Sequence, residues 1–328
     1  MIALFAFVVT LAAGALATYT VLLWLRRRAI LDHPNERSSH SVPTPRGGGL
    51  ALIPVVLVVW AILGALGKAP SGLWIAIAVG FALMIVSAID DRIGLPAAVR
   101  LLAHVAAAVV GVAALPSDAP VLQGLVPLPV DRVIAVLAWV WFVNLYNFMD
   151  GIDGITGVET AAIGLGIALL AFVHATPDLA VAATLGAAGL GFLIWNWHPA
   201  RIFMGDAGSV PFGFLLGWLL LAMAARGAWA AALILPGYYL ADATITLVVR
   251  LLSGERVWQA HRRHFYQRAL RGGGSHAAVA WRIAVADLLL IVLAFASLDR
   301  PWIALGGAAL VVAALLAEFV RLGGTARG

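Results

Sequence analysis

A succession of long apolar segments dominates this sequence and limits the folds open to it. The first runs from Ile2 to Leu25, and comparable segments follow at short intervals. A helix needs about 20 apolar residues to cross a bilayer, and in lipid only helices and closed barrels satisfy their backbone hydrogen bonds. Only 11% of the 328 residues are charged, against roughly 25% in soluble domains. We therefore predict an all-α, polytopic integral membrane protein with one membrane-embedded domain over residues 1–328.

The apolar segments predict about 10 to 11 transmembrane helices. The candidate spans are 2–25, 49–66, 73–89, 97–115, 133–147, 156–174, 179–197, 210–225, 229–251, 277–295 and 302–319. No positive residue precedes the first segment and three arginines follow it, so we interpret it as an uncleaved span. The proline-rich segment 116–130 is too short to span, and we interpret it as a short periplasmic hairpin lying on the membrane.

Basic residues are distributed very unequally over the loops of this topology. With the N-terminus outside, the outside segments hold only Lys68, Arg132, Arg226 and Arg300, and the other loop arginines lie inside. This asymmetry follows the positive-inside rule. It also accounts for the net charge of +5 without a nucleic-acid partner. Cysteine is absent, which excludes disulfides and thiolate metal sites.

Five polar clusters fall on the predicted cytoplasmic side, in the loops 26–48, 90–97, 144–156, 196–209 and 252–276. The densest begins with Asn144 and Asn147, which are three residues apart and share a helix face. Asp150 and Asp153 follow, each next to a glycine that permits a turn. In so apolar a chain, this much polarity must face water, a partner or a ligand.

Together these clusters supply carboxylates, amides, imidazoles and guanidiniums at one membrane surface. Mg²⁺ prefers oxygen ligands and is usually held by one or two carboxylates and substrate phosphates. Arginine forks match phosphate oxygens. Gly205, Gly208 and Ser209 precede a predicted helix, whose free N–H groups could bind an anion. The combination favours a phosphorylated substrate and a divalent cation.

Each cluster also has a purely structural interpretation. Asp90 and Asp91 could simply end a span, and Asp206 could cap a helix. His261 and His264 lie among arginines and could bind lipid headgroups. Asp242 could orient a site residue, but we interpret it as structural. The same interpretation is given to His33, His104, His174 and His198.

The motifs in these loops resemble those of the polyprenyl-phosphate N-acetylhexosamine-1-phosphate transferases. They are Asp32-x-Pro34-x-x-Arg37-x-x-His40-x-x-Pro43-x-Pro45-Arg46-Gly47-Gly48, Asp90-Asp91, Asn144-x-x-Asn147-x-x-Asp150-Gly151-x-Asp153-Gly154, Phe203-Met204-Gly205-Asp206-x-Gly208-Ser209, and His261 with His264. Five such matches in order are specific, whereas one alone is weak. The two histidines are separated by Arg262-Arg263. This departs from the three adjacent histidines expected of phospho-N-acetylmuramoyl-pentapeptide transferases, and it is more similar to the branch that initiates O-antigen or enterobacterial common antigen.

The resemblance implies a reaction, its partners and a location. N-acetylhexosamine-1-phosphate would pass from a UDP-sugar, UDP-GlcNAc or a related UDP-HexNAc, to undecaprenyl phosphate, with UMP as the second product. Mg²⁺ would be required, with Mn²⁺ as a substitute. The step would initiate a lipid-linked surface polysaccharide such as the O-antigen of lipopolysaccharide. The enzyme would lie in the bacterial inner membrane among its lipids, with the active site facing the cytoplasm, and a homodimer is compatible with the resemblance.

The resemblance also implies roles for individual residues. The predicted catalytic residues are Asp90, Asp91 and Asp206, and the predicted metal ligands are Asp206, Asp150 and Asp91. The predicted substrate-binding residues are Arg37, His40, Arg46, Asn144, Asn147, Asp150, Asp153, Asn196, His261, Arg262, Arg263 and His264. Within these sets, Asp90 is the candidate for positioning or deprotonating the lipid phosphate. The motifs leave open a covalent intermediate or a direct attack by the lipid phosphate.

Two other classes of protein compete with this interpretation. A transporter of an anionic lipid-linked or nucleotide substrate would carry polar residues near the middle of the bilayer, often at broken helices. Here the polar clusters lie at one face, and only Asp242 and Asp287 are placed deep. A structural scaffold gives no reason for five charged clusters on one side. The sequence therefore favours the enzyme.

Overall fold

The computed structural model describes residues 1–34, 42–176, 178–256 and 261–324, and it confirms the all-α, polytopic prediction. In chain order the α-helices are α1 (Ile2–Arg27), α2 (Gly49–Ala65), α3 (Leu73–Ile93), α4 (Ala97–Val112), α5 (Leu128–Phe148), α6 (Ile155–Val173), α7 (Asp178–Asn196), α8 (Asp206–Met223), α9 (Trp229–Ile234), α10 (Gly237–Leu252), α11 (Phe265–Arg271), α12 (His276–Ala296) and α13 (Pro301–Gly324). A π-helical turn, η1 (Ala224–Ala228), joins α8 to α9. Two short strands, β1 (Leu31–Asp32) and β2 (Thr44–Pro45), pair antiparallel in the first loop.

Eight helical segments in the described residues are long and apolar enough to cross a membrane. They are α1, α3, α5, α6, α7, α8 with its continuation to Ile234, α12 and α13. The shorter apolar helices α2 and α4 add two candidates, which agrees with the predicted number of spans. The predicted span 229–251 is wrong as a single helix. It is divided into α9 and α10 at Leu235–Pro236, because proline disrupts the hydrogen bonding of a helix interior.

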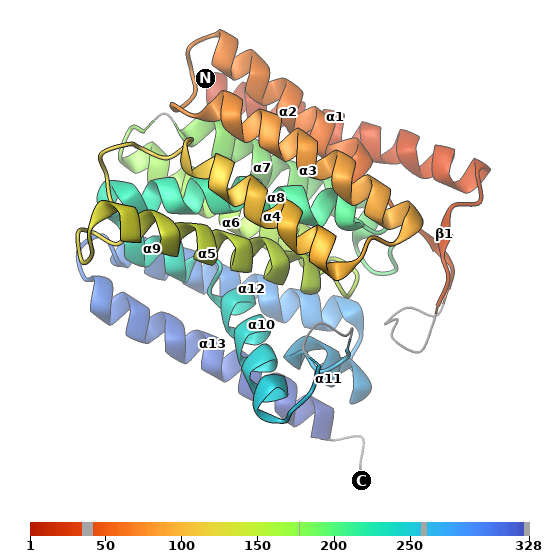
Figure 1. Cartoon of the computed structure of the whole chain (residues 1–328). Helices are drawn as coiled ribbons and strands as arrows, with labels where there is room; N and C mark the ends of the chain where they lie inside the picture. The colour runs from red at the N-terminus through yellow and green to blue at the C-terminus, as the bar shows by residue number, and fades with distance from the viewer. Residues whose placement is uncertain (35–41, 177, 257–260, 325–328) are drawn as a thin grey trace.

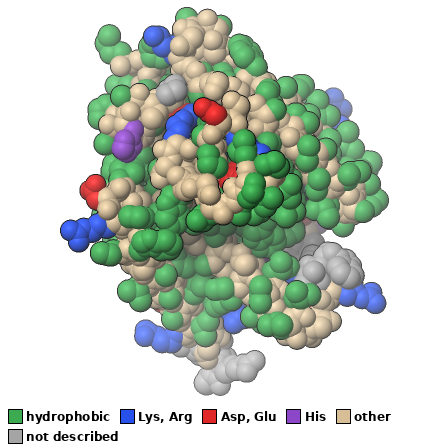
Figure 2. All heavy atoms as spheres, turned by 60° about the vertical axis from the view of Figure 1, so that its left-hand side comes forward, with side chains coloured by type: hydrophobic (Ala, Val, Ile, Leu, Met, Phe, Trp, Pro, Cys, Tyr) green, Lys and Arg blue, Asp and Glu red, His purple; other side chains and the backbone are tan. Residues whose placement is uncertain are grey.

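The helices form one bundle with α8 inside it (Figure 1). Helices α3 and α5 pack on α8, while α6 packs along α7 and α7 packs along α1. On the face seen in Figure 2, most of the coloured side chains are hydrophobic and few are charged. Large apolar side chains such as Leu4, Phe172, Leu252 and Trp302 are exposed on the bundle. Such a surface is stable in lipid, where exposed apolar side chains carry no cost.

Small residues allow a close helix contact between α6 and α7. A Cβ added at Gly164 would lie 2.4 Å from the backbone nitrogen of Gly186. Lipid offers little hydrophobic gain for helix association, so close backbone packing at small residues supplies much of the attraction. The packing of this pair places the start of α6, near Asp153, beside the end of α7, near Asn196.

The segment interpreted as a hairpin near 116–130 contains no β-ladder among the described residues. It is a loop of turns up to Pro127, after which α5 begins at Leu128. The buried carboxylate of Asp131 accepts hydrogen bonds from the backbone nitrogens of Val121 and Leu122, at 3.1 and 2.7 Å. Arg132, the next residue of α5, donates to the carbonyls of Pro116, Ser117 and Ala119. The loop is therefore held by side chains of the following helix and needs no strand pairing.

Candidate active site

Backbone hydrogen bonds join the first-loop motif to the Phe203–Ser209 motif. The Phe203 nitrogen donates to the Pro45 carbonyl at 2.8 Å, and the nitrogens of Gly47 and Gly48 donate to the Phe203 carbonyl at 3.0 and 2.9 Å. The next contact brings the Gly49 nitrogen to the Met204 carbonyl at 2.9 Å. These contacts place the Arg46 side chain over the start of α8.

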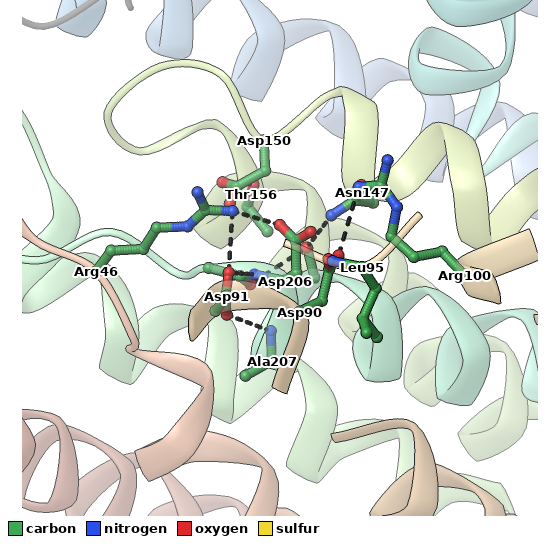
Figure 3. A network of polar contacts seen from close by, with 12 residues as sticks. Arg46, Asp90, Asp91, Leu95, Arg100, Asn147, Asp150, Thr156, Asp206 and Ala207 are labelled. Atoms are coloured by element: carbon green, nitrogen blue, oxygen red, sulfur yellow. Dashed lines mark hydrogen bonds and ion pairs between the residues drawn. The ribbon is translucent and has the colours of Figure 1, made fainter. Parts of the chain in front are cut away.

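Arg46 joins the two aspartates that were predicted to be catalytic metal ligands. Its Nη2 lies 2.5 Å from Asp206 Oδ1 and 3.0 Å from Asp91 Oδ1. Asp91 also accepts hydrogen bonds from the backbone nitrogens of Asp206 and Ala207, at 3.1 and 2.9 Å, so it caps the N-terminus of α8 (Figure 3). Burial lowers the pKa of Arg46, but the charges of Asp206 and Asp91 outweigh this effect and raise that pKa above its usual value. The guanidinium therefore stays charged between the carboxylates.

The donor atoms around Arg46 fit a hard divalent cation. Asp91 and Asp206 present carboxylate oxygens to one point, and Asp150 lies near them beside the Arg46 guanidinium (Figure 3). Mg²⁺ takes oxygen ligands of this kind. The three predicted metal ligands thus belong to one centre, in which Arg46 supplies the positive charge in this structure.

Asp150 carries a pKa that is matched to binding a cation near neutral pH. Burial raises its pKa to about 6, against lowering contributions from a hydrogen bond of Thr156 and the charge of Arg46. The Thr156 hydroxyl donates to Asp150 Oδ1 at 2.5 Å. Asp150 is therefore ionised at neutral pH but is protonated readily below pH 6.

Asp90 faces a different cavity from Asp91. Asp90 Oδ1 accepts from the Leu95 nitrogen at 2.6 Å, and Oδ2 lies 3.4 Å from Arg100 Nη1 (Figure 3). The cavity has a volume of about 160 Å³. Its polar lining comprises Ser87, Asp90, Arg100, His104, Asn144, Asn147 and Asp206, and its apolar lining comprises Leu83, Val86, Ala97, Leu101, Phe148 and Val210. A polar end and an apolar wall suit an amphiphilic ligand.

The two predicted asparagines of α5 both line this cavity. Asn147 Nδ2 donates to Ser209 Oγ at 2.9 Å, which ties α5 to the first turn of α8. Asn144 Nδ2 donates to the Val140 carbonyl at 2.7 Å, and its Oδ1 lies 3.2 Å from His104 Nδ1. His104 thus contacts a predicted site residue.

Asp153 and Asn196 belong to a second cluster, on the other side of the loop that follows α5. Asp153 Oδ2 lies 2.6 Å from His198 Nδ1 and accepts from the Ala200 nitrogen at 3.1 Å, and Oδ1 lies 3.2 Å from His276 Nδ1. Burial alone raises the pKa of Asp153, but hydrogen bonds from His276 and His198 outweigh it and lower that pKa below the usual value. Asp153 is therefore a stable anion.

Asn196 connects the loops of this second cluster. It accepts from the Gly154 nitrogen and donates to the Ile202 carbonyl, both at 2.9 Å. The side chain is buried and both of its polar ends contact backbone. Its observed contacts clamp the loops, and its predicted contact with substrate stays a prediction.

Asp242 contacts the histidine cluster at the N-terminus of α11. Its fully buried carboxylate accepts from the backbone nitrogens of Phe265 and Tyr266, at 3.1 and 3.4 Å, and Oδ1 lies 3.0 Å from His264 Nδ1. A negative charge at a helix N-terminus is favourable, and here it also orients His264. Asp242, which we interpreted as structural, therefore contacts a predicted site residue directly.

The remaining members of this cluster lie at the surface above α11. The ring centroids of His261 and His264 are 4.8 Å apart, and Arg263 forms an ion pair with Glu255. Burial, followed by the positive charges of His264 and Arg250, lowers the pKa of His261 to about 4. His261 is consequently neutral at physiological pH. Arg262 is placed in the same loop.

The loop from Met149 to Gly154 joins all three clusters. Asp150 faces the carboxylates around Arg46, and Asp153 faces the two histidines. Gly151 packs against the Tyr266 hydroxyl, where an added Cβ would lie at 2.1 Å. The structure thus brings residues from all five predicted loops to one end of the bundle, with Arg46 as the contribution of the first loop. The predictions for Arg37 and His40 lie outside the described residues.

Sequence reasoning missed several residues that contact the predicted ones. They are Arg100, Thr156, His276 and Tyr266, together with His198 and His104, which we interpreted as structural. The spacing of Thr156 after Asp150 was a usable signal, because a hydroxyl at a helix start often serves a neighbouring loop. The others come from distant segments, and no local pattern indicated them.

The comparisons with known proteins agree with this geometry. A family model described as glycosyl transferase family 4 matches residues 73–224. Decaprenyl-phosphate N-acetylglucosaminephosphotransferase of Mycolicibacterium smegmatis is 30% identical over 312 residues, covering 80% of this chain and 75% of the relative. The chain belongs to glycosyl transferase family 4. The resemblance drawn from the motifs is confirmed.

Other relatives of this family member come from more than one branch. A probable undecaprenyl-phosphate N-acetylglucosaminyl 1-phosphate transferase of Bacillus subtilis is 28% identical over 292 residues, covering 83% of this chain and 78% of the relative. A phospho-N-acetylmuramoyl-pentapeptide-transferase of Symbiobacterium thermophilum is 32% identical over 292 residues, covering 78% and 85%. Its family and the eight helices in the described residues that are able to span a bilayer identify this chain as a multi-pass membrane protein.

Proposed function

We propose that this protein transfers N-acetylhexosamine-1-phosphate from a UDP-HexNAc, with UDP-GlcNAc as the first candidate, to undecaprenyl phosphate. The products are undecaprenyl-diphosphate-sugar and UMP. The observation that carries the proposal is the Arg46–Asp91–Asp206 centre at one end of a membrane bundle. The names of the relatives, which are polyprenyl-phosphate sugar phosphotransferases, support the same reaction. We place the active site on the cytoplasmic side of the bacterial inner membrane.

In this proposal the cavity beside Asp90 receives the lipid phosphate. The Arg100 guanidinium attracts the phosphate, while apolar residues such as Leu101 and Phe148 contact the first part of the chain. Asp90 is already engaged by the Leu95 nitrogen and Arg100, so its carboxylate is held in one orientation. Its role is to position Arg100 and the acceptor phosphate at the side of Asp206.

The donor diphosphate would lie on the Arg46 side of Asp206. Asp91, Asp150 and Asp206 are proposed to hold Mg²⁺, which when bound neutralises the diphosphate and reduces its repulsion of the acceptor phosphate. Arg46 then exchanges carboxylate partners for phosphate oxygens, which its fork also matches. His264, oriented by Asp242, and Asp153 with the loop around it bind the rest of the donor.

Initiation of a lipid-linked surface polysaccharide, such as O-antigen, is the pathway role we propose. The support is the sequence His261-Arg262-Arg263-His264, in which the histidines are not adjacent. The transferase of the peptidoglycan precursor is the alternative within the family, and a relative with that name matches the chain well. Donor selectivity distinguishes the two.

The test is release of UMP by purified protein supplied with undecaprenyl phosphate and a panel of UDP-HexNAc donors and UDP-N-acetylmuramoyl-pentapeptide. We expect release with a UDP-HexNAc, its loss on addition of EDTA, and its recovery with Mg²⁺ or Mn²⁺. Asp206→Asn should lower kcat by about 100-fold or more, since it removes a ligand that stabilises transition-state charge. The control is Asp118→Asn, in the exposed loop between α4 and α5. No release by folded protein with any donor would favour a transporter instead.

A further inference from the structure

A compact group of one carboxylate and two imidazoles lies apart from the carboxylates around Arg46. Asp153, His198 and His276 come from the loop before α6, the loop after α7 and the start of α12. Each offers one ligand atom, and the three atoms lie within 4.8 Å of one another. His198 and His276, which are 45 and 123 positions away from Asp153, thus both contact its carboxylate, and His276 Nδ1 also accepts from the Asp153 backbone nitrogen.

We propose that Asp153, His198 and His276 form a binding site for a transition-metal ion of the Zn²⁺ class. Two imidazole nitrogens and one carboxylate oxygen are a set that Zn²⁺ and its neighbours in the first row bind, and that Mg²⁺ does not prefer. The chemistry of the ligands thus separates this site from the all-oxygen centre at Asp91 and Asp206. The inference does not depend on the proposed transferase activity.

The present spacing of the ligand atoms requires only a small adjustment. Asp153 oxygens lie 2.6 Å from His198 Nδ1 and 3.2 Å from His276 Nδ1. In a tetrahedral zinc site with bonds of about 2.0–2.1 Å, neighbouring ligand atoms are about 3.3 Å apart. The two carboxylate–imidazole pairs therefore need to separate by less than about 1 Å when the ion binds, and no two of the three ligand atoms start more than 4.8 Å apart. Rotation of two side chains supplies this.

The surroundings of the cluster hold its loops and leave one side open. The Ala200 nitrogen donates to Asp153 Oδ2 at 3.1 Å, and Asn196 ties the Gly154 nitrogen to the Ile202 carbonyl. Supporting hydrogen bonds of this kind orient metal ligands. The exposed fraction is 38% for the His198 side chain, 12% for His276 and 8% for Asp153. An ion can enter past His198, and water can complete its coordination.

A bound ion would fasten three segments of the chain at this end of the bundle. Without it, the loops before α6 and after α7 meet α12 here through contacts of the two imidazoles with the Asp153 carboxylate. A ligand that binds only the folded state stabilises that state by mass action. The proposal therefore predicts a rise in Tm with Zn²⁺ that is separate from any effect of Mg²⁺.

The experiment uses full-length protein in detergent, without a polyhistidine tag, stripped with a chelator and kept in excess Mg²⁺. Zn²⁺ is titrated by calorimetry, the metal content is measured after desalting, and Tm is followed in parallel. We expect one Zn²⁺ per chain and a Tm increase. His198→Gln and His276→Gln should each weaken Zn²⁺ binding at least tenfold. His174→Gln, an exposed histidine at the end of α6, is the matched control, and His261→Gln tests the other histidine pair.

A second measurement uses wild-type protein, so its result does not depend on whether a variant folds. Co²⁺ added to the stripped wild-type protein should produce the strong visible absorption of a tetrahedral site, and Zn²⁺ should displace it. The proposal is overturned if wild-type protein binds no Zn²⁺ above the level of non-specific sites, if His198→Gln binds as well as His174→Gln, or if binding is lost in His261→Gln only. In those cases Asp153 is a hydrogen-bonded carboxylate that binds no metal ion.

Discussion

The replacement Asp242→Asn is the sharpest test of how the histidine cluster is positioned. Asp242 is fully buried in α10 and lies under the N-terminus of α11. Its carboxylate accepts from the Phe265 nitrogen and the Tyr238 hydroxyl, both at 3.1 Å, and lies 3.0 Å from His264 Nδ1. Asparagine has the same shape, but it lacks the charge and turns one acceptor into a donor.

The expected loss of stability follows from counting these contacts. Hydrogen bonds to a charged group contribute about 1.5–3 kcal/mol each, neutral ones about 0.5–1.5, and an unpaired buried donor costs about 1–3 kcal/mol. In Asp242→Asn the remaining bonds become neutral, and at least one donor from Phe265 or Tyr238 faces an N–H group. We expect the unfolding free energy to fall by about 2–4 kcal/mol.

The effect on activity comes from the imidazole. With Asp242 in place, His264 Nδ1 lies 3.0 Å from the carboxylate, and this contact fixes the orientation of the ring. Without the charge this orientation is no longer enforced. We expect kcat for UMP release to fall about 10- to 100-fold, which corresponds to about 1.4–2.8 kcal/mol of transition-state stabilisation.

A double-mutant cycle separates positioning from stability. Asp242→Asn is combined with His264→Gln, and kcat is measured at a temperature where all variants are folded. If Asp242 acts through His264, Asp242→Asn lowers kcat little in protein that already carries His264→Gln. Thr246→Val, which removes the hydroxyl that donates one hydrogen bond of 3.2 Å to the same carboxylate, is the control and should leave kcat nearly unchanged. Independent, multiplicative losses of kcat in the cycle would refute the positioning role.

Three further predictions concern packing and pH. Gly49→Ala should cost more than about 3 kcal/mol of stability or prevent folding, since its Cβ would lie 2.1 Å from the Gly208 nitrogen. Gly306→Ala, where nothing lies within 4 Å, should instead stabilise α13 by about 0.5–1 kcal/mol. Equal Tm values for the two variants would contradict this. Because Asp150 has a pKa of about 6, Mg²⁺ affinity should fall as pH drops below 6, and Asp150→Asn should bind weakly without this pH dependence, as calorimetry can show. The pKa of His261 is about 4 in the folded protein, against an ordinary value of 6.5. The unfolded state therefore gains a proton first, and the unfolding free energy should decline as pH falls from 6.5 toward 4. Denaturant titrations should find a smaller decline in His261→Gln.

Some features of this protein were readable from local patterns alone. Apolar length located the helices, because a bilayer demands a fixed number of apolar residues whatever the fold. The division of 229–251 at Leu235–Pro236 was also marked in the sequence, by a proline inside an apolar run, and was missed because hydropathy alone was used to draw that span. The loop before α5 was misread as a hairpin because its turns are closed by a buried side chain, Asp131, that periodicity does not show.

Many polar side chains of the candidate site were also conspicuous in the sequence, because in an apolar chain each ionisable residue stands out and is costly to bury. Their partners were not. Arg46 meets Asp206 across 160 positions, and Asp242 meets His264 across 22, through loops whose course spacing does not indicate. His198 and His276 had no motif at all, yet both reach Asp153.

The sequence by itself thus determined the class of the protein, the ends of most of its membrane-spanning helices to within a few residues, and many of the residues that form the candidate site. Only the tertiary structure decided which of them meet: Arg46 with Asp91 and Asp206, Asp90 with Arg100, and Asp153 with two histidines. The physical reason is that composition and hydropathy are properties of each segment, whereas a site is made by hydrogen bonds and close helix packing between segments that are distant in the chain.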